Sequence, residues 1–146
     1  MHTPRTATFT QLSGRTLYRL LQLRAEVFVV EQECPYADLD GLDPAESTLH
    51  LWLAETDEPL AYLRITEEQE YSRIGRVCTR SSHRGRGLAS QLLAHALPLL
   101  GDKPTVLHAQ THVTGLYRRH GFEISGSEFF EDGIPHVPMR YQRVTR

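Results

Sequence analysis

Cysteine is scarce in this sequence, and long apolar runs are absent. The 146 residues include two cysteines, Cys34 and Cys78, and no CxxC pair. This excludes a disulfide framework and a four-thiolate zinc site, and it is typical of reduced thiols in the cytoplasm. No segment has the ~20 consecutive apolar residues that a membrane-spanning helix needs. Residues 1–15 are polar and lack the apolar core of a signal peptide. We therefore expect a cytoplasmic protein without a membrane partner.

An excess of charge of one sign is also lacking. Sixteen Lys and Arg stand against 18 Asp and Glu, which gives a net charge of −2. The only Arg-Gly pairs are adjacent, without interleaved aromatic residues, so we expect no nucleic-acid partner. His108 and His112 lack the Glu that follows the first His of a helical zinc-hydrolase motif, and the eight histidines are otherwise scattered. No metal site is predicted.

The balanced total hides an uneven distribution. Between Arg24 and Arg64 there is no Lys or Arg, whereas ten acidic residues lie in that interval. Arginines are frequent further on, at Arg80, Arg84, Arg86, Arg118 and Arg119. The distribution predicts an acidic region and a basic region in the same molecule.

Length and pattern indicate one domain over residues 1–146. A chain of this size buries roughly 68 to 70% of the surface that it exposes when unfolded, and the sequence has no repeat, linker or low-complexity stretch. The predicted elements are a helix from about Arg15 to Val29 with Ser13 as its N-cap, an irregular acidic loop over 31–46, strands over Leu49–Glu55, Leu60–Ile65 and Tyr71–Thr79, a helix over Gly87–Leu97 ended by Pro98, a strand over Thr105–Ala109, a helix over Thr114–His120 and strands from Phe122 and Val137. This order predicts an α/β (α+β) fold with a mixed sheet.

The segment Ser82–Ser90 lies between a predicted strand and a predicted helix. Gly85 and Gly87 allow a ligand to approach the backbone closely, and the first turn of the helix leaves its amide N–H groups unpaired. Arg84 and Arg86 add charge-assisted hydrogen bonds. The segment therefore predicts a diphosphate site at the helix N-terminus.

Two familiar phosphate motifs do not match this segment. A P-loop needs Gly-Lys-Ser/Thr, which is absent. A dinucleotide fold needs a third glycine where Ser90 stands, and an acid about 20 residues further on, where Leu107 and His108 stand. The alternative from the residues alone is an Arg-Gly turn that only starts a helix.

The spacing of Arg84, Gly87 and Ala89 resembles the acyl-coenzyme-A loop of the GCN5-related N-acetyltransferase (GNAT) superfamily. Downstream, Leu116–Phe122 resembles that family's later helix, which ends in Tyr, three residues, Gly and Phe. The resemblance to the ElaA-like branch extends over nearly the whole chain, on the segments Val27–Tyr36, Asp38–Asp43, Ile74–Val77 and Glu131–His136. It implies a single-domain GNAT fold, a mixed twisted sheet with helices on both faces.

The resemblance also implies acetyl coenzyme A as acetyl donor, with no metal. Backbone groups at Val77, Cys78 and Thr79 would hold its pantetheine arm between two diverging strands. The pyrophosphate would lie on a loop made of Arg84, Gly85, Arg86, Gly87, Leu88 and Ala89. Gln110 stands where relatives carry Asn, and Tyr117 matches the tyrosine that donates a proton to the departing sulfur. Arg118 and Arg119 would meet the adenosine 3′-phosphate.

The proton acceptor is left open by this resemblance. Many relatives carry a Glu on the third strand, where this chain has Gly75 and Arg76. Glu33 with the rest of the acidic loop, Glu131 and His136 are the candidates, and each has the alternative of a solvated charge or a capping side chain.

The implied reaction is transfer of acetyl to a primary amine of a small molecule or peptide. The acidic loop and the Glu131–Asp132 pair favour a cationic acceptor, with Glu33, Asp38, Glu131 and His136 as its candidate contacts. The alternative is a non-catalytic acyl-coenzyme-A sensor, which the missing strand Glu allows and Tyr117 argues against. A homodimer is compatible with either reading, and the sequence does not determine the oligomeric state.

Overall fold

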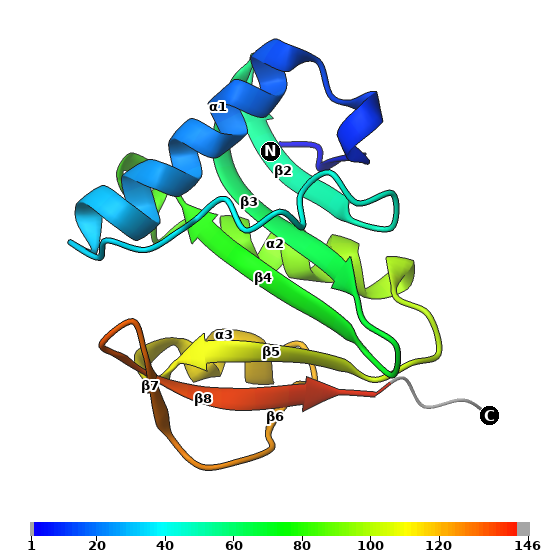
Figure 1. Ribbon diagram of the computed structural model, residues 1–146, viewed down its shortest axis with the longest axis vertical. Coiled ribbons are helices and arrows are strands. Elements are labelled where there is room, and N and C mark those ends of the chain that lie inside the picture. Colours follow the sequence, from blue (N-terminus) through cyan, green and yellow to red (C-terminus); the bar gives the residue numbers. More distant parts are fainter. Residues whose placement is uncertain (1, 143–146) are drawn as a thin grey trace.

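The computed structural model of the protein describes residues 2–142. Within this range eight strands form one mixed sheet in the order β1-β2-β3-β4-β5-β8-β6, with β7 paired to β8 (Figure 1). The strands are β1 (Arg5–Ala7), β2 (Leu49–Glu55), β3 (Glu58–Glu67), β4 (Ser72–Thr79), β5 (Thr105–Gln110), β6 (Glu123–Ile124), β7 (Phe129–Glu131) and β8 (Ile134–Tyr141). The helices are α1 (Gly14–Arg24), the π-helix η2 (Ala25–Glu31), α2 (Leu88–Ala96) and α3 (Thr114–Arg118), with short 3-10 turns at Phe9–Gln11, Ser81–His83, Leu97–Leu99 and Thr111–Val113.

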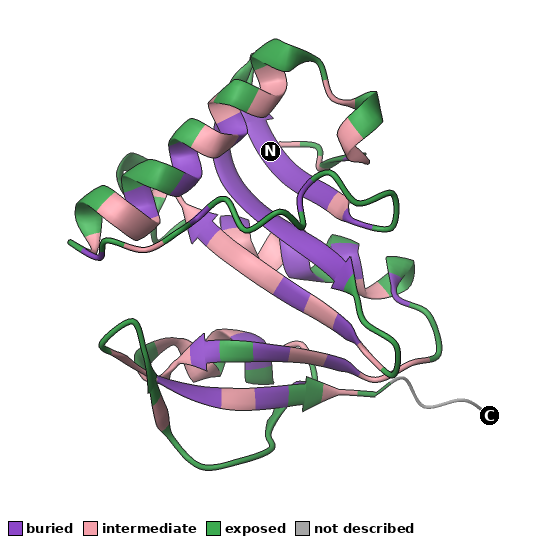
Figure 2. Ribbon diagram, in the orientation of Figure 1, coloured by how far each residue is buried: buried purple, intermediate pink, exposed green. Residues whose placement is uncertain are grey.

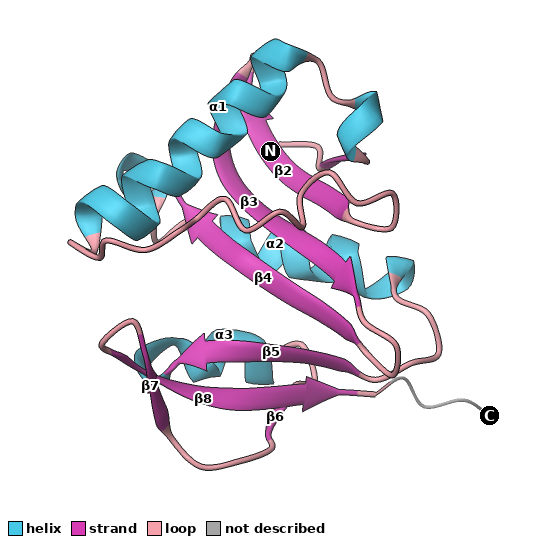
Figure 3. Cartoon of the chain, in the orientation of Figure 1, coloured by secondary structure: helices cyan, strands magenta, loops and turns pink. Residues whose placement is uncertain are grey.

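Helices cover both faces of the sheet, as the GNAT resemblance implied. Successive side chains of a strand point to opposite faces. Accordingly Leu51 and Leu53 of β2 pack in the core that contains α2, whereas Trp52 packs with Leu20 and Leu23 of α1. Figure 3 shows α1 and α2 on opposite sides of β2 and β3, and Figure 2 shows these two central strands buried along most of their length. This double coverage fixes the sheet.

The parallel strands β4 and β5 separate soon after they begin. Their pairing consists of Ser72 with Thr105 and Arg73 with Val106, both near the N-terminal ends of the strands. Beyond that point the two ribbons diverge (Figure 1). The edge of β4 that faces β5 therefore has no strand partner after Arg73, while its other edge remains paired with β3. Backbone amides on that open edge are available to a ligand.

The first helix differs from the prediction in its second half. Ser13 caps α1 as expected, since its hydroxyl accepts a hydrogen bond from the Thr16 amide at 3.1 Å. After Arg24 the backbone widens into a π-helix, in which the Gln32 amide donates to the Val27 carbonyl. A hydrophobic pattern does not distinguish an α-helix from a π-helix, because the π-helix continues the apolar pattern of α1 and differs from it in its i→i+5 hydrogen bonds.

The remaining elements match closely, with a few differences. The helix expected to end at Pro98 passes into a 3-10 turn at Leu97–Leu99. The sequence prediction missed β1, the turn at Phe9–Gln11 and the separate strand β7. Short elements such as these lack a full period of hydrophobic alternation. No helix within residues 2–142 is long and apolar enough to cross a membrane.

Candidate active site

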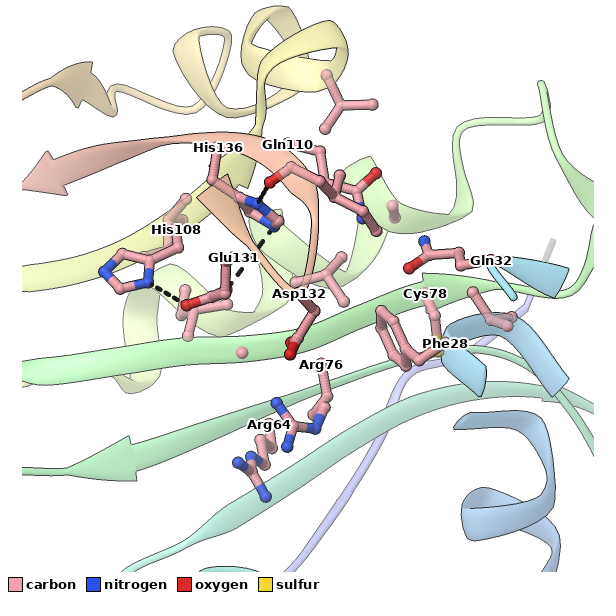
Figure 4. Close-up of a pocket in the computed structure, with 18 of the residues that line it drawn as sticks. Phe28, Gln32, Arg64, Arg76, Cys78, His108, Gln110, Glu131, Asp132 and His136 are labelled. Atoms are coloured by element: carbon pink, nitrogen blue, oxygen red, sulfur yellow. Dashed lines mark hydrogen bonds and ion pairs between the residues drawn. The ribbon is translucent and has the colours of Figure 1, made fainter. Parts of the chain in front are cut away.

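A cavity of about 620 Å³ opens where β4 and β5 diverge (Figure 4). Its walls come from β4, β5, β8, the π-helix, the start of α2, α3 and the turn between β7 and β8. Nine residues singled out from the sequence line it: Val77, Cys78, Thr79, Arg84, Ala89, Gln110, Tyr117, Glu131 and His136. These nine residues, which span 59 positions from Val77 to His136, thus share one cavity.

The loop before α2 has the backbone form that the glycines predicted. Gly85 and Gly87 have φ of +78° and +75°, which is the left-handed region that glycine adopts without strain. A Cβ built at either glycine would meet no atom within 4 Å, so the surface beside them is open. Leu88 turns into the core and Arg86 is exposed; neither lines the cavity.

Arg84 forms an ion pair with Glu31 at the rim of the cavity. Two guanidinium nitrogens donate to the two Glu31 carboxylate oxygens, one of them at 2.8 Å, and Nε donates to the Thr79 carbonyl at 3.1 Å. The hydrogen bond from Arg84 lowers the pKa of Glu31. The predicted phosphate-loop arginine thus already holds a carboxylate in this structure.

Tyr117 lies on α3 with 6% of its surface exposed, and it lines the cavity. Burial raises the pKa of Tyr117, so the phenol is protonated at neutral pH. Its ring packs edge-on against Phe122, with 6.2 Å between centroids. Among the described residues its hydroxyl has no hydrogen-bond partner. A protonated, unoccupied donor at a cavity wall suits proton donation.

Cys78 is the one thiol on the β4 wall. Burial raises the pKa of Cys78 to about 12, so its sulfur is a thiol and not a thiolate at neutral pH. The thiolate is the nucleophilic form of cysteine. Cys78 therefore serves as a packing residue among Leu23, Val27 and Tyr62 rather than as an acyl carrier.

Glu33 and Asp38, two predicted acceptor contacts, do not line the cavity. Glu33 is exposed, with a left-handed φ of 51°. Asp38 is 8% exposed and binds Arg24 and Arg76 at 3.1 Å and 2.9 Å. A carboxylate that neutralises one buried and one half-buried guanidinium group is committed to the fold.

The other aspartates of the acidic loop are neutralised in the same way. Asp43 accepts hydrogen bonds from Arg24 at 2.7 Å and Arg64 at 2.9 Å. Asp40 pairs with Arg64 and, at 3.3 Å, with Arg76. Burial alone would raise the pKa of Asp40, but the hydrogen bonds from Arg64 and the Leu42 amide, together with the charges of Arg64 and Arg76, outweigh burial and lower the pKa to about 2. The expected free acidic surface is instead a network of three aspartates and three arginines.

A second cluster lies on the opposite wall, around Glu131 (Figure 4). Its carboxylate lies 3.1 Å from His108 Nδ1 and 3.7 Å from His136 Nε2. The Phe129 ring packs against both imidazoles, with centroid distances of 4.9 Å and 6.0 Å. Within residues 2–142 no group of three His, Cys, Asp or Glu is placed to hold a metal ion. The cluster therefore offers carboxylate and imidazole groups for proton chemistry.

A tight hairpin turn brings this cluster together. Asp132 and Gly133, between β7 and β8, both have positive φ, at 52° and 78°. Two left-handed residues in succession make a type I′ turn, for which Asp-Gly is a preferred sequence. The turn places Glu131 opposite Ile134 and aligns Phe129 with His136.

The sequence prediction missed several cavity residues, chiefly Phe28, Gln32, Arg64, Arg73 and His108. Phe28 lies in the π-helix and Gln32 directly follows it, and both line the cavity. His108 was set aside as one of many scattered histidines, and only strand pairing shows that it lies beside β8. The Asp-Gly dipeptide was the one local signal for the hairpin at Asp132.

The family comparison agrees with this geometry. Residues 18–143 match the family model described as an acetyltransferase (GNAT) domain. The chain belongs to the GNAT acetyltransferase family. Among curated relatives, UPF0039 protein Rv2851c of Mycobacterium tuberculosis is 50% identical over 133 residues, which cover 88% of this chain and 85% of that protein. Protein ElaA of Escherichia coli is 41% identical over 137 residues, covering 89% and 90% of the two chains.

Solved GNAT structures confirm the fold. The crystal structure of Escherichia coli ElaA superposes with a TM-score of 0.92 at 38% identity, covering 97% of this chain and 100% of that one. The structure of an acyl-CoA N-acyltransferase from Pseudomonas aeruginosa superposes with a TM-score of 0.88 at 41% identity, covering 97% of this chain and 99% of that one. An aminoglycoside 6′-N-acetyltransferase complexed with coenzyme A shares the fold alone, with a TM-score of 0.76 at 10% identity over 97% and 98% of the two chains. The ElaA-like assignment and the GNAT fold are thus both confirmed.

Proposed function

We propose that this protein is an N-acetyltransferase that transfers the acetyl group of acetyl coenzyme A to a primary amine of a cationic acceptor. One observation carries the proposal: a single cavity combines the diverging edge of β4, the rim of the loop before α2 and the protonated Tyr117 phenol. Membership of the GNAT family supports the same reaction class.

The residues present fit the coenzyme. The open edge of β4 from Ile74 to Thr79 provides backbone donors and acceptors for an amide-containing arm. Gly85 and Gly87 leave open space at the N-terminus of α2, where unpaired amides and the helix dipole favour phosphate. Exposed Arg86, Arg118 and Arg119 supply further positive charge close to that end of α2 and on α3. When bound, the coenzyme supplies a thioester that an amine attacks at the carbonyl carbon and whose sulfur departs.

The reaction has two proton requirements, and Tyr117 meets one of them. An amine with an unperturbed pKa near ~10.4 must lose a proton before it attacks. The sulfur must gain one, and the buried, protonated phenol of Tyr117 is the donor on α3. Loss of the phenol proton is transient, because burial disfavours the phenolate.

The charges that line the cavity favour a cationic acceptor. Arg64 and Arg76 are paired with aspartates, and Arg84 is paired with Glu31. Asp132, by contrast, has no ionic partner among the described residues, and Glu131 contacts only histidines. The uncompensated charge on the β7–β8 side is therefore negative, which attracts a cation.

A panel of amines tests the proposal. Acetyl coenzyme A is incubated with the protein and with polyamines, amino sugars, lysine peptides or amines that carry a carboxylate, and free thiol is measured. We expect amine-dependent thiol release, with the highest kcat/KM for a cationic acceptor. A preference for acidic acceptors would contradict the acceptor class. Coenzyme binding without thiol release above hydrolysis would support the sensor alternative instead.

A further inference from the structure

The protonation of His136 follows from its hydrogen bonds. Nδ1 lies 2.7 Å from the Ile134 carbonyl, which can only accept, so Nδ1 carries a hydrogen. In the neutral ring Nε2 then carries a lone pair and is an acceptor. It lies 3.7 Å from Glu131 Oε2, which is an acceptor as well. Two facing acceptors are stabilised when a proton comes between them. His136 Nε2 is therefore placed to receive a proton next to a carboxylate.

Glu131 is held from its other side by a second imidazole. Arg73 Nη1, which can only donate, lies 3.4 Å from His108 Nε2. His108 Nδ1 thus carries the hydrogen and donates it to Glu131 Oε1 at 3.1 Å. This chain of directed bonds orients the Glu131 carboxylate, and Phe129 packs between the two rings. Such bonds fix the tautomer and direction of the reacting group.

We propose that His136 Nε2 accepts the proton of the amine, that Glu131 stabilises the resulting imidazolium, and that His108 and Arg73 position Glu131. The assignment rests on the acetyl transfer proposed above. Imidazole is suited to this role because its charge changes between pH 5 and 8. His136 thus takes the role of proton acceptor, for which β4 offers Gly75 and Arg76 in place of a glutamate.

The proton balance of the reaction calls for a route to water. An ammonium group that becomes an amide loses two protons; one restores the Tyr117 phenol after it has protonated the sulfur, and one leaves the site. The His136 side chain is 9% exposed, whereas Glu131 and His108 are 45% and 36% exposed. The second proton therefore moves from the cavity wall at His136, by way of Glu131, to water at the surface.

Other charged groups that face this pair are few. Arg73 on β4 and His108 on β5 belong to the chain of bonds, and Asp132 stands beside Glu131 in the hairpin turn. Arg64 and Arg76 lie across the cavity, and both are neutralised by aspartates (Figure 4). The local field at His136 is thus set mainly by Glu131.

The experiment compares pH profiles with the best acceptor of the amine panel. Wild type should show kcat/KM rising with pH through an acidic limb near neutrality. His136→Gln should lower kcat about 100-fold and remove that limb. Its dissociation constant for coenzyme A, measured by calorimetry, and its thermal unfolding midpoint should stay near wild type.

Glu131→Gln provides a second, conservative test. The amide still accepts from His108 but no longer carries charge, so an imidazolium at His136 is less stable. The acidic limb should move to lower pH, with kcat reduced about tenfold. A purely structural role of Glu131 would lower activity without moving the limb.

Controls separate the possible failures. His95→Gln, on α2 outside the cavity, makes the same substitution at a residue whose hydrogen bond within residues 2–142 is to Thr6, and it should leave the profile unchanged. If wild type acetylates no amine, the proposed function fails. If wild type is active and His136→Gln keeps its turnover and acidic limb, the assignment of His136 is overturned while the function stands. If His136→Gln fails to fold, the Glu131→Gln profile decides.

Discussion

In the proposed reaction, proton donation to the departing sulfur depends on Tyr117. Replacement by Phe removes one hydroxyl and retains the ring that packs on Phe122. We predict that Tyr117→Phe lowers kcat about 100-fold, because the departing sulfur loses its proton donor. The dissociation constant for acetyl coenzyme A should remain within a factor of about two, since binding uses mainly backbone groups. Steady-state kinetics and calorimetry measure the two effects separately.

Tyr18 supplies the matched control for this prediction. It is 71% exposed on α1, outside the cavity, and Tyr18→Phe should leave kcat unchanged. Equal turnover in Tyr117→Phe and wild type would remove Tyr117 from the mechanism.

Glu31 places a negative charge at the rim where a polyanionic coenzyme would bind. Its ion pair with Arg84 is exposed, and such pairs contribute only ~0.2–1 kcal/mol to stability. We predict that Glu31→Gln tightens coenzyme A binding about threefold at low salt, because Arg84 becomes free for phosphate and a like charge is removed. The difference should shrink at 0.5 M salt, where screening is stronger.

Glu46→Gln makes the same change of net charge in the exposed part of the acidic loop and should leave the affinity unaltered. Weaker coenzyme binding in Glu31→Gln would show that Glu31 positions Arg84 rather than competing for it.

Features that depend on local spacing were accessible from the sequence. Gly85, Gly87 and Tyr117 lie within short motifs, and the structure gives the glycines the left-handed backbone that the motif requires. His108 and Arg64 were missed because their neighbours are distant in the chain. Arg64 on β3 meets Asp40, 24 positions away, and His108 meets Glu131, 23 positions away.

At the scale of elements, the loop before α2 combines a left-handed backbone with the proposed phosphate site. Gly87 caps α2 in a left-handed conformation, where an alanine costs ~1–2 kcal/mol. We predict that Gly87→Ala lowers the free energy of unfolding by about that amount and weakens coenzyme A binding about tenfold, because a methyl group projects into the open surface of the loop. Urea denaturation and calorimetry measure these effects.

Gly101→Ala is the comparison, since Gly101 also has open space but no positive φ. It should change neither quantity. Wild-type coenzyme affinity in Gly87→Ala would show that the loop does not hold the phosphates.

The acidic loop is a folded element anchored by ion pairs, and its stability depends on pH. The pKa of Asp40 is about 2 in the folded protein, below the ~3.9 of an unfolded aspartate. Its contribution to stability is therefore complete above about pH 4 and is lost as the pH falls toward 2. We predict that the destabilisation caused by Asp40→Asn at pH 7 shrinks at pH 2, by about 1 kcal/mol, because Asp40 is partly exposed and solvent screens its ion pairs. Urea denaturation across this range tests it.

Asp102→Asn, at an exposed position without an ionic partner among the described residues, should show no such convergence. A constant difference between Asp40→Asn and wild type from pH 7 to pH 2 would contradict the role of Asp40 in the network.

Elements with a full hydrophobic period were predicted well, and those shaped by packing were not. The central strands, α2 and the Ser13 cap follow from local pattern. The π-helix over Ala25–Glu31 continues the apolar pattern of α1, so its wider turn is invisible in the sequence. This segment nevertheless brings Phe28 and Glu31 to the cavity.

At the scale of the molecule, the uneven charge distribution has a different meaning from the one predicted. Arg24 and Arg64, which bound the stretch without basic residues, fold back onto its aspartates. The acidic loop is thereby neutralised and fixed against the sheet. Among the described residues, the negative charge at the cavity that no arginine or lysine neutralises comes from the β7–β8 hairpin instead, at Glu131 and Asp132.

The overall topology was accessible because two motifs in the right order indicated the family resemblance. The match to the GNAT family model confirms that resemblance. The divergence of β4 and β5 has no local signature, since both read as ordinary strands. It arises because β5 continues its pairing with β8 while β4 continues with β3. The cavity is therefore a property of the whole sheet.

The central claim is that this cavity transfers acetyl to an amine, and the fate of a labelled acetyl group tests it most directly. Acetyl coenzyme A labelled in the acetyl carbons is incubated with the protein and its best amine, and both products are quantified by mass spectrometry. The account predicts one labelled N-acetyl group on the amine for each coenzyme thiol released, with the yield strongly reduced in Tyr117→Phe. Label recovered only as acetate, or remaining on the coenzyme, would contradict it.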